Sequence, residues 1–306
     1  MTISSHLTTY AGLPILGWDA KEDPADPAAV AWRVEAEEFD APPEQFEAAF
    51  ERMLGRAGPG GPVALVIGEW GEAYENRPPL DLLIRHASRL GRLRSLFVGD
   101  MTVEQCEISW INQGDYTPLL AAFPALERLG IRGTSGLVLE PVRHEGLREL
   151  VLQAGGLPPA IVRAVAGCDL PHLTHLELWL GVENYDGGAT LEDLGPILSG
   201  RVFPALTYLG LRNAENADEI AAAVAAAPVV GRLRELDLSL GMMGDAGGEA
   251  LLTGQPLDHL AALTLSHHFM SAEISERIVA ELPGVRVDVS DVQSEERWGR
   301  YTMVAE

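Results

Sequence analysis

The sequence predicts an α/β solenoid of about ten repeats, with a curved parallel sheet inside and helices over most of the convex side. Three observations predict this class of fold. A leucine pattern recurs along the chain, its copies are spaced like structural repeats, and the segments between the copies change to a helical period. One repeat has too small a core to be stable alone, so the stacking of neighbours must supply the rest.

The leucine pattern has the form L-x-x-L-x-L. It is clearest in two segments that nearly copy each other, Phe-Pro-Ala-Leu-Glu-Arg-Leu-Gly-Ile-Arg from Phe123 and Phe-Pro-Ala-Leu-Thr-Tyr-Leu-Gly-Leu-Arg from Phe203. Six triplets are complete: Leu126/Leu129/Ile131, Leu147/Leu150/Leu152, Leu173/Leu176/Leu178, Leu206/Leu209/Leu211, Leu233/Leu236/Leu238 and Leu260/Leu263/Leu265. Looser versions are Ala29/Trp32/Val34, Pro62/Leu65/Ile67, Leu93/Leu96/Val98 and Leu282/Val285/Val287.

The spacing of the triplets fits a repeat protein. Their first positions run from Ala29 to Leu282 at intervals of 33, 31, 33, 21, 26, 33, 27, 27 and 22 residues, with a mean of about 28. The second and third positions are two residues apart, so both point to the same side of a short strand. The residues between and beside them point to the other, open side, which the solenoid makes concave.

Four segments between the strands have the period of an amphipathic helix: residues 44–54, 80–90, 217–227 and 271–282. Ser271 is expected to be the N-cap of the last one. Prolines stand near helix starts, where a missing N–H costs little; they are Pro42, Pro79, Pro158 and Pro159. The interval of 21 residues after Leu126 leaves no room for a good helix, and residues 136–141 are expected to form a short extended run.

These triplets resemble the leucine-rich-repeat family, nearest to its ribonuclease-inhibitor-like subclass. The chain departs from that family at the ninth position of each repeat, where Asn or Cys usually bonds the turn backbone. That position holds Trp70, Met101, Thr134, Gly155, Gly181, Ala214, Gly241, His268 and Ser290. The segment Ile67-Gly-Glu-Trp-Gly-Glu-Ala-Tyr-Glu-Asn76 is similar to an uncharacterised bacterial leucine-rich-repeat group. That resemblance implies that the gene for this chain lies near a gene for a radical-SAM-type enzyme. It implies no established activity.

The expected organisation has three parts. Residues 1–28 form an N-terminal segment or cap, residues 29–289 form the leucine-rich-repeat domain, and residues 290–306 form a C-terminal capping tail. The ends of repeat arrays need polar caps that stop further stacking. The tail has suitable charges in Asp291, Glu295, Glu296 and Arg297.

Composition limits the partners. The 306 residues include 45 acidic and 22 basic ones, a formal net charge of −23, which disfavours nucleic acid and anionic membranes. The acidity serves either solubility or the attraction of a basic protein or peptide. The two cysteines, Cys106 and Cys168, have no CxxC spacing and fit small buried residues in a reducing compartment. With no signal peptide and no long apolar run, we expect a cytoplasmic protein, without a cofactor.

The concave face is the first candidate binding surface. Its early positions are small or mixed: Ala31, Arg33, Ala64, Val66, Ser95 and Phe97. Its later positions are richer in the aromatic and charged types found at binding hot spots, namely Glu149, His175, Glu177, Trp179, Tyr208, Arg212, Glu235 and Asp237. We expect a patch centred on Trp179, Tyr208 and Arg212, with a hollow at Gly210. The alternative is that these side chains merely cover an exposed sheet.

The loops that leave the strands are the second candidate surface, since loops on a rigid scaffold often carry function. They include Trp70, the Gly99-Asp-Met turn, Tyr185, the Asn213-Ala-Glu-Asn turn and His267-His-Phe-Met. Trp70 and Tyr185 are the aromatic candidates for binding. The alternative is that each aromatic ring packs onto its own repeat.

The sequence gives only weaker indications of metal binding or catalysis. His175 and Glu177 share a strand face and could hold a metal, and Glu235 with Asp237 could serve acid–base catalysis. No set of nucleophile, base and orienting residue converges. The leading hypothesis is therefore a non-enzymatic scaffold that binds a protein or peptide. One alternative is an accessory subunit of a metabolic, radical-SAM-type enzyme; another is a hydrolase or metal-dependent enzyme using the acidic residues of the concave face.

Overall fold

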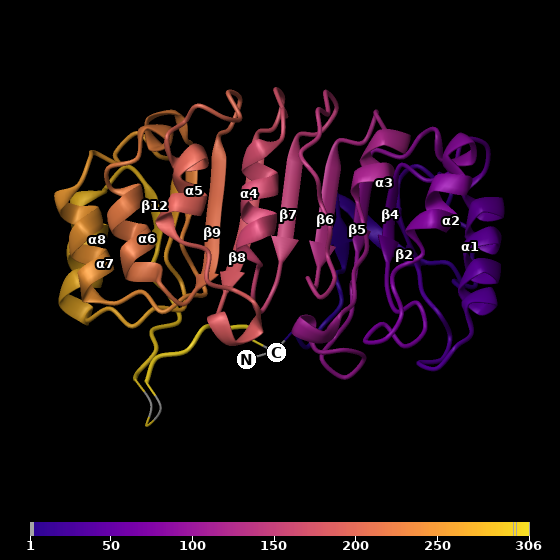
Figure 1. Ribbon diagram of the computed structural model, residues 1–306, viewed down its shortest axis with the longest axis horizontal. Coiled ribbons are helices and arrows are strands. Elements are labelled where there is room, and N and C mark those ends of the chain that lie inside the picture. Colours follow the sequence, from indigo (N-terminus) through magenta and orange to yellow (C-terminus); the bar gives the residue numbers. More distant parts are fainter. Residues whose placement is uncertain (1–2, 296, 298, 306) are drawn as a thin grey trace. The chain divides into compact units, whose positions relative to one another are not determined.

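The computed structural model describes residues 3–295, 297 and 299–305 (Figure 1). The chain forms two compact bodies, an N-terminal body that ends at Leu150 and a C-terminal body from Val151 to Ala305. The described residues contain twelve strands and eight α-helices, and all but one of the named strand pairs are parallel. The chain is therefore a mixed α/β protein with mostly parallel strands.

The N-terminal body contains strands β1 (Thr9–Tyr10), β2 (Leu13–Gly17), β3 (Ala31–Val34), β4 (Ala64–Ile67), β5 (Ser95–Val98) and β6 (Arg128–Arg132). The first pair, β1 and β2, is antiparallel, and each strand from β2 to β6 pairs in parallel with the next. The connections carry α1 (Pro43–Ala57), α2 (Leu80–Arg85), α3 (Thr117–Ala122) and the 3-10 turns η1 (Ala87–Leu90) and η2 (Ile108–Trp110). Strand β2 lies within the segment predicted as an N-terminal cap, so that segment extends the sheet.

The C-terminal body contains β8 (His175–Gly181), β9 (Tyr208–Ala214), β10 (Glu235–Asp237), β11 (Ala262–Thr264) and β12 (Arg286–Asp288), paired in parallel in chain order. Its helices are α4 (Pro159–Gly167), α5 (Leu191–Leu198), α6 (Ala217–Val224), α7 (Asp245–Thr253) and α8 (Ala272–Glu281), with 3-10 turns η3 (Glu183–Tyr185) and η4 (Pro228–Arg232). Figure 1 shows α4 and α6 in front of the strands. Strand β7 (Glu149–Gln153) contains the boundary between the bodies.

The core of each body is a ladder of the predicted leucines. In the C-terminal body Leu176, Leu209, Leu236 and Leu263 pair across four successive strands, and all are almost completely buried. Burying a leucine stabilises a fold by roughly 1.5–3 kcal/mol. A slip of one residue would turn every leucine of a strand to the opposite face, so the ladder fixes the register.

The last predicted triplet is wrong by two residues. Leu263, a second position, pairs with Val287, which the leucine pattern places third. The physical reason is the length of α8, which reaches Glu281 and leaves Leu282 as its C-cap. The chain needs two further residues to turn, so the first position of this repeat is Gly284 and not Leu282.

The helical periods predicted real helices, with shifted ends. Residues 44–54 lie within α1, and Ser271 caps α8 by accepting a hydrogen bond from the Ile274 N–H at 3.4 Å. The predicted helix over 80–90 is divided at His86 into α2 and η1, and α6 stops at Val224. Within residues 136–141, Val138 bridges Asp115 in parallel, whereas Gly136 lies in a turn with a φ of 64°.

Both ends of the chain fold back onto their own body. The Leu7 N–H donates to Asp100 Oδ1 at 3.1 Å, and the Val103 N–H donates to the Ile3 carbonyl at 2.8 Å. At the other end the Val304 N–H donates to Asn213 Oδ1 at 3.0 Å. The predicted capping residue Glu296 lies outside the described residues. Within the part of the chain that the structure describes, no helix is long and apolar enough to cross a membrane.

Candidate functional site

Six predicted binding residues lie together on one face of three adjacent strands. We term them the open-face cluster: His175, Glu177 and Trp179 of β8, Tyr208 and Arg212 of β9, and Asp237 of β10. Side chains alternate along a strand, so the leucines between them enter the core and the cluster residues point the opposite way. The parallel register sets His175 beside Tyr208 and Trp179 beside Arg212.

Gly210 lies at the centre of the open-face cluster, paired with Glu177 on one side and Asp237 on the other. A Cβ atom at this position would lie 3.1 Å from Glu177 Cγ and 3.2 Å from the Tyr208 hydroxyl oxygen. The prediction of a hollow here is wrong, because Tyr208 and Glu177 fill the space. The missing side chain instead allows the Tyr208 ring to lean across its own strand.

Arg212 joins the two carboxylates of the cluster. Its Nη1 donates to Glu177 Oε1 at 2.9 Å, and its Nε lies 3.3 Å from Asp237 Oδ2 and donates to Ser239 Oγ at 3.1 Å. Burial would lower the pKa of Arg212, but the negative charges of Glu177 and Asp237 outweigh it and raise the pKa above its ordinary value. The guanidinium is therefore a permanent cation that neutralises one of the two carboxylates.

Tyr208 connects the same two carboxylates through its hydroxyl group. The hydroxyl oxygen lies 3.1 Å from both Glu177 Oε2 and Asp237 Oδ2, so its one proton can be donated to either. Burial, and then the two negative charges, raise the pKa of Tyr208 far above its ordinary value. On the other side of the ring, His175 is stacked on Tyr208 with centroids 3.7 Å apart. Tyr208 is thus held in place from three directions.

Trp179 is the buried member of the cluster and contacts both Glu177 and Arg212. Its indole Nε1 donates to Glu177 Oε1 at 2.7 Å, and the Arg212 guanidinium carbon lies 5.3 Å from the centre of its ring. Trp179 is buried, whereas Tyr208, Arg212 and His175 are partly exposed. A ligand would therefore meet the edges of these three side chains, while Trp179 supports them.

Both carboxylates of the cluster are occupied by hydrogen-bond donors. Glu177 accepts hydrogen bonds from Trp179 and Arg212, and Asp237 accepts one from the Ser239 N–H at 3.0 Å. Either carboxylate can accept the single Tyr208 proton. Carboxylates that hold so many donors are poorly placed to abstract a proton. Among the described residues, no three His, Cys, Asp or Glu side chains are grouped as metal ligands.

The other predicted site residues do not all join the cluster. Glu235 pairs with Tyr208 in the sheet and is half-buried at the edge of the cluster. Glu149 belongs to the N-terminal body, where its carboxylate lies 3.3 Å from Arg128 Nε. Trp70 is buried and donates from Nε1 to the carbonyl of Asn76 at 3.0 Å, so it packs into its own loop. Tyr185 is half-buried in η3.

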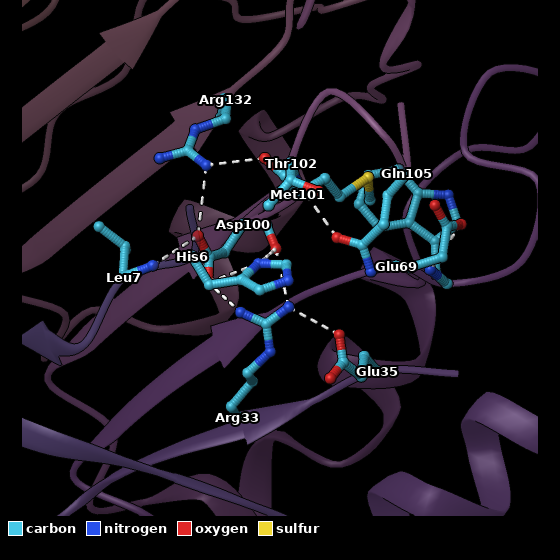
Figure 2. Close-up of polar contacts among 11 residues, drawn as sticks. His6, Leu7, Arg33, Glu35, Glu69, Asp100, Met101, Thr102, Gln105 and Arg132 are labelled. Carbon is cyan, nitrogen blue, oxygen red and sulfur yellow. Dashed lines mark hydrogen bonds and ion pairs between the residues drawn. The ribbon is translucent and has the colours of Figure 1, made fainter. Parts of the chain in front are cut away.

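Sequence reasoning missed a buried ionic cluster in the N-terminal body (Figure 2). Asp100, which is fully buried, is bonded to the Arg33 guanidinium and lies 3.3 Å from Arg132 Nη1. Arg33 also donates to Glu35 at 2.6 Å, and His6 Nδ1 lies 3.2 Å from the Asp100 carbonyl oxygen. The signal available in the sequence was the pair of arginines among small apolar residues on the predicted open face.

The chain's own N-terminal segment covers the open face of the N-terminal body. Tyr10 meets the Phe97 ring edge-on, with centroids 5.7 Å apart, and its hydroxyl donates to the Leu96 carbonyl at 2.8 Å. Val66 and Phe97, which open-face positions would expose, are buried. This face is therefore already occupied, whereas the open-face cluster of the C-terminal body remains partly exposed.

Comparison with known proteins supports the fold and assigns no activity. No protein-family model matches the sequence, and no curated protein matches it. The chain is similar to a Bacteroides fragilis protein of known crystal structure, with 29% sequence identity and a TM-score of 0.79. The match covers 89% of this chain and 76% of that protein. An α/β fold with a mostly parallel sheet is what this likeness supports.

Proposed function

We propose that the chain is a leucine-rich-repeat solenoid of the ribonuclease-inhibitor-like type that acts as a non-enzymatic scaffold for a protein or peptide. The leucine ladders, which align repeat by repeat in each body, and the alternation of strands with helices support the repeat assignment. The binding surface is the open-face cluster of the C-terminal body.

The observation that carries this proposal is the rigid, partly exposed arrangement of Tyr208, Arg212 and His175. Tyrosine and arginine are enriched at binding hot spots, where side chains already fixed before binding lose little entropy. Arg212 compensates only one of the two carboxylates of the cluster, and Glu235 adds another negative charge beside it. The surface therefore favours a partner that presents Lys or Arg, in keeping with the net charge of −23.

Site-specific crosslinking tests the proposal. A photoreactive side chain at His175, in the full chain expressed in its source cell, should capture a discrete protein that mass spectrometry identifies. The control is the same side chain at Glu276, which is exposed on α8 of the same body. Capture of the same proteins at both positions would contradict the proposal.

The identified partner then allows a matched charge test. Glu235→Arg should weaken binding about tenfold, since it places a cation against a basic ligand, and Glu276→Arg should leave binding unchanged. Isothermal titration calorimetry measures both. Equal affinities for the two variants would refute an open-face contact. If the partner is an enzyme, a change in its turnover when the chain is added would identify an accessory subunit.

A further inference from the structure

Three residues in successive repeats of the C-terminal body share an uncommon backbone conformation. Asn213 lies near the end of β9, and Leu240 and His267 follow β10 and β11, at intervals of 27 residues. Their φ angles are 56°, 69° and 58°. A positive φ is uncommon in residues other than glycine, and for leucine it is a strained choice. We term these three residues the turn row.

The C-terminal segment of the chain runs along the turn row and contacts one member per repeat. His267 Nε2 lies 3.3 Å from the Tyr301 carbonyl oxygen, and the Met303 N–H donates to the Leu240 carbonyl at 2.9 Å. These contacts use the main chain of the segment. Main-chain bonding of this kind is how proteins hold an extended peptide, while side chains supply specificity.

Asn213 holds the main chain of the segment through two hydrogen bonds to Val304. Its Nδ2 donates to the Val304 carbonyl at 2.5 Å, and its Oδ1 accepts from the Val304 N–H at 3.0 Å, so one side-chain amide satisfies both peptide groups of Val304. The second proton of Nδ2 is donated to the Ala154 carbonyl at 3.2 Å, which fixes the orientation of the amide. Asn213 is fully buried beneath the segment.

Two neighbouring side chains of the segment, Arg300 and Tyr301, contact residues in and beside the turn row. Arg300 donates to Asp218 at 3.2 Å and to the Met242 carbonyl at 3.1 Å. The Tyr301 ring meets His267 and Phe269 edge-on at 5.5 and 5.4 Å. The charged groups of Arg300 and Asp218 are about a third exposed, so solvent screens this pair and the contact is readily broken.

We propose that the turn row is a groove for an extended peptide with a basic–aromatic pair, and that its ligand is the segment Arg300–Ala305 of this chain. The chain's own segment fills the groove in cis, and the same segment of a second copy fills it in trans. A second copy is the occupant favoured by the contacts, because exchange of identical terminal segments recreates every one of them. The chain's own segment competes at a high effective concentration. The fraction of chains that bind the segment of a second copy therefore increases with protein concentration. This groove uses residues other than the open-face cluster, so either proposal can fail without the other.

A fluorescent peptide with the sequence of residues 297–306 tests the groove in the full chain. The Tyr301→Ala chain, whose own segment is weakened, should bind the peptide at least tenfold more tightly than the unaltered chain does. Tyr74→Ala, an exposed tyrosine of the N-terminal body, is the matched control and should behave like the unaltered chain. Adding Asn213→Gly to Tyr301→Ala should abolish binding; glycine removes the amide and tolerates the positive φ of 56°.

Two further measurements test association between copies and opening of the segment. Differently tagged full chains, mixed at high concentration, should co-purify, and Tyr301→Ala in both should reduce their association. Amide hydrogen exchange of Met303 and Val304 in the unaltered chain should be faster than that of β9, since the segment opens without global unfolding. A folded Tyr301→Ala chain that binds no peptide, or exchange of the segment as slow as that of β9, would overturn the proposal.

Discussion

Asp100 is the position where a single change of charge should be most costly. Its side chain is fully buried, and the side chains of its partners Arg33 and Arg132 are 7% and 5% exposed. Asp100→Asn keeps the shape but leaves two buried guanidinium groups without their shared anion. Burial already lowers the pKa of Arg132, and the Asp100 charge opposes that shift. Removing one partner of a buried ion pair costs about 3–5 kcal/mol.

Thermal unfolding measures this loss. For a body of this size, about 3–5 kcal/mol corresponds to a fall in Tm of about 10 °C. The matched control is Asp23→Asn, because Asp23 pairs with Arg56 at 2.7 Å but its side chain is 74% exposed. That exposed pair should contribute less than about 1 kcal/mol. Similar shifts for the two variants would refute the view that Asp100 neutralises the two arginines in the buried cluster.

Two further predictions concern Glu69 and Gly210. Burial raises the pKa of Glu69 above 4.5, and its Oε2 has no hydrogen-bond partner among the described residues. The stabilising effect of the protonated form is complete below pH 4.5 and is lost as pH rises through the raised pKa. The Glu69→Gln variant should therefore gain stability relative to the unaltered chain as pH rises from 4.5 through that pKa. Urea midpoints check this, and a pH-independent difference would refute it. Gly210→Ala should lose about 1–3 kcal/mol, since the added Cβ must displace Tyr208 or Glu177; a Tm equal to that of Gly231→Ala, where nothing lies within 4 Å, would show that the cluster tolerates it.

The strands were predictable because their signal is periodic. Leucines at second and third positions appear in the sequence and again in the pairing of β8, β9, β10 and β11. Helix α5 was not predicted, since Gly195 and Pro196 both have low helical propensity. The capping box of Thr190 with Asp193 compensates for them. Such local compensation has no period, so a search for spacing does not detect it.

The candidate site was predictable in outline and not in detail. Strand alternation placed Glu177, Trp179 and Tyr208 on one face, as expected. It did not reveal that Trp179 is buried, or that Arg212 lies between the two carboxylates. Those features depend on side-chain direction across strands, which follows from packing and not from sequence spacing. The contacts of the chain ends were equally hidden, because each occurs once and joins residues about 90 positions apart.

Those two terminal contacts also bear on how the protein is made. Leu7 meets Asp100 across 93 residues, and Val304 meets Asn213 across 91. During synthesis Leu7 cannot dock until Asp100 has been translated. In the same way, Asn213 is translated well before Val304, which it will hold. The N-terminal body can therefore close before the C-terminal body, whose turn row waits for the segment Arg300–Ala305. In the interval the turn row is open to the same segment of another copy.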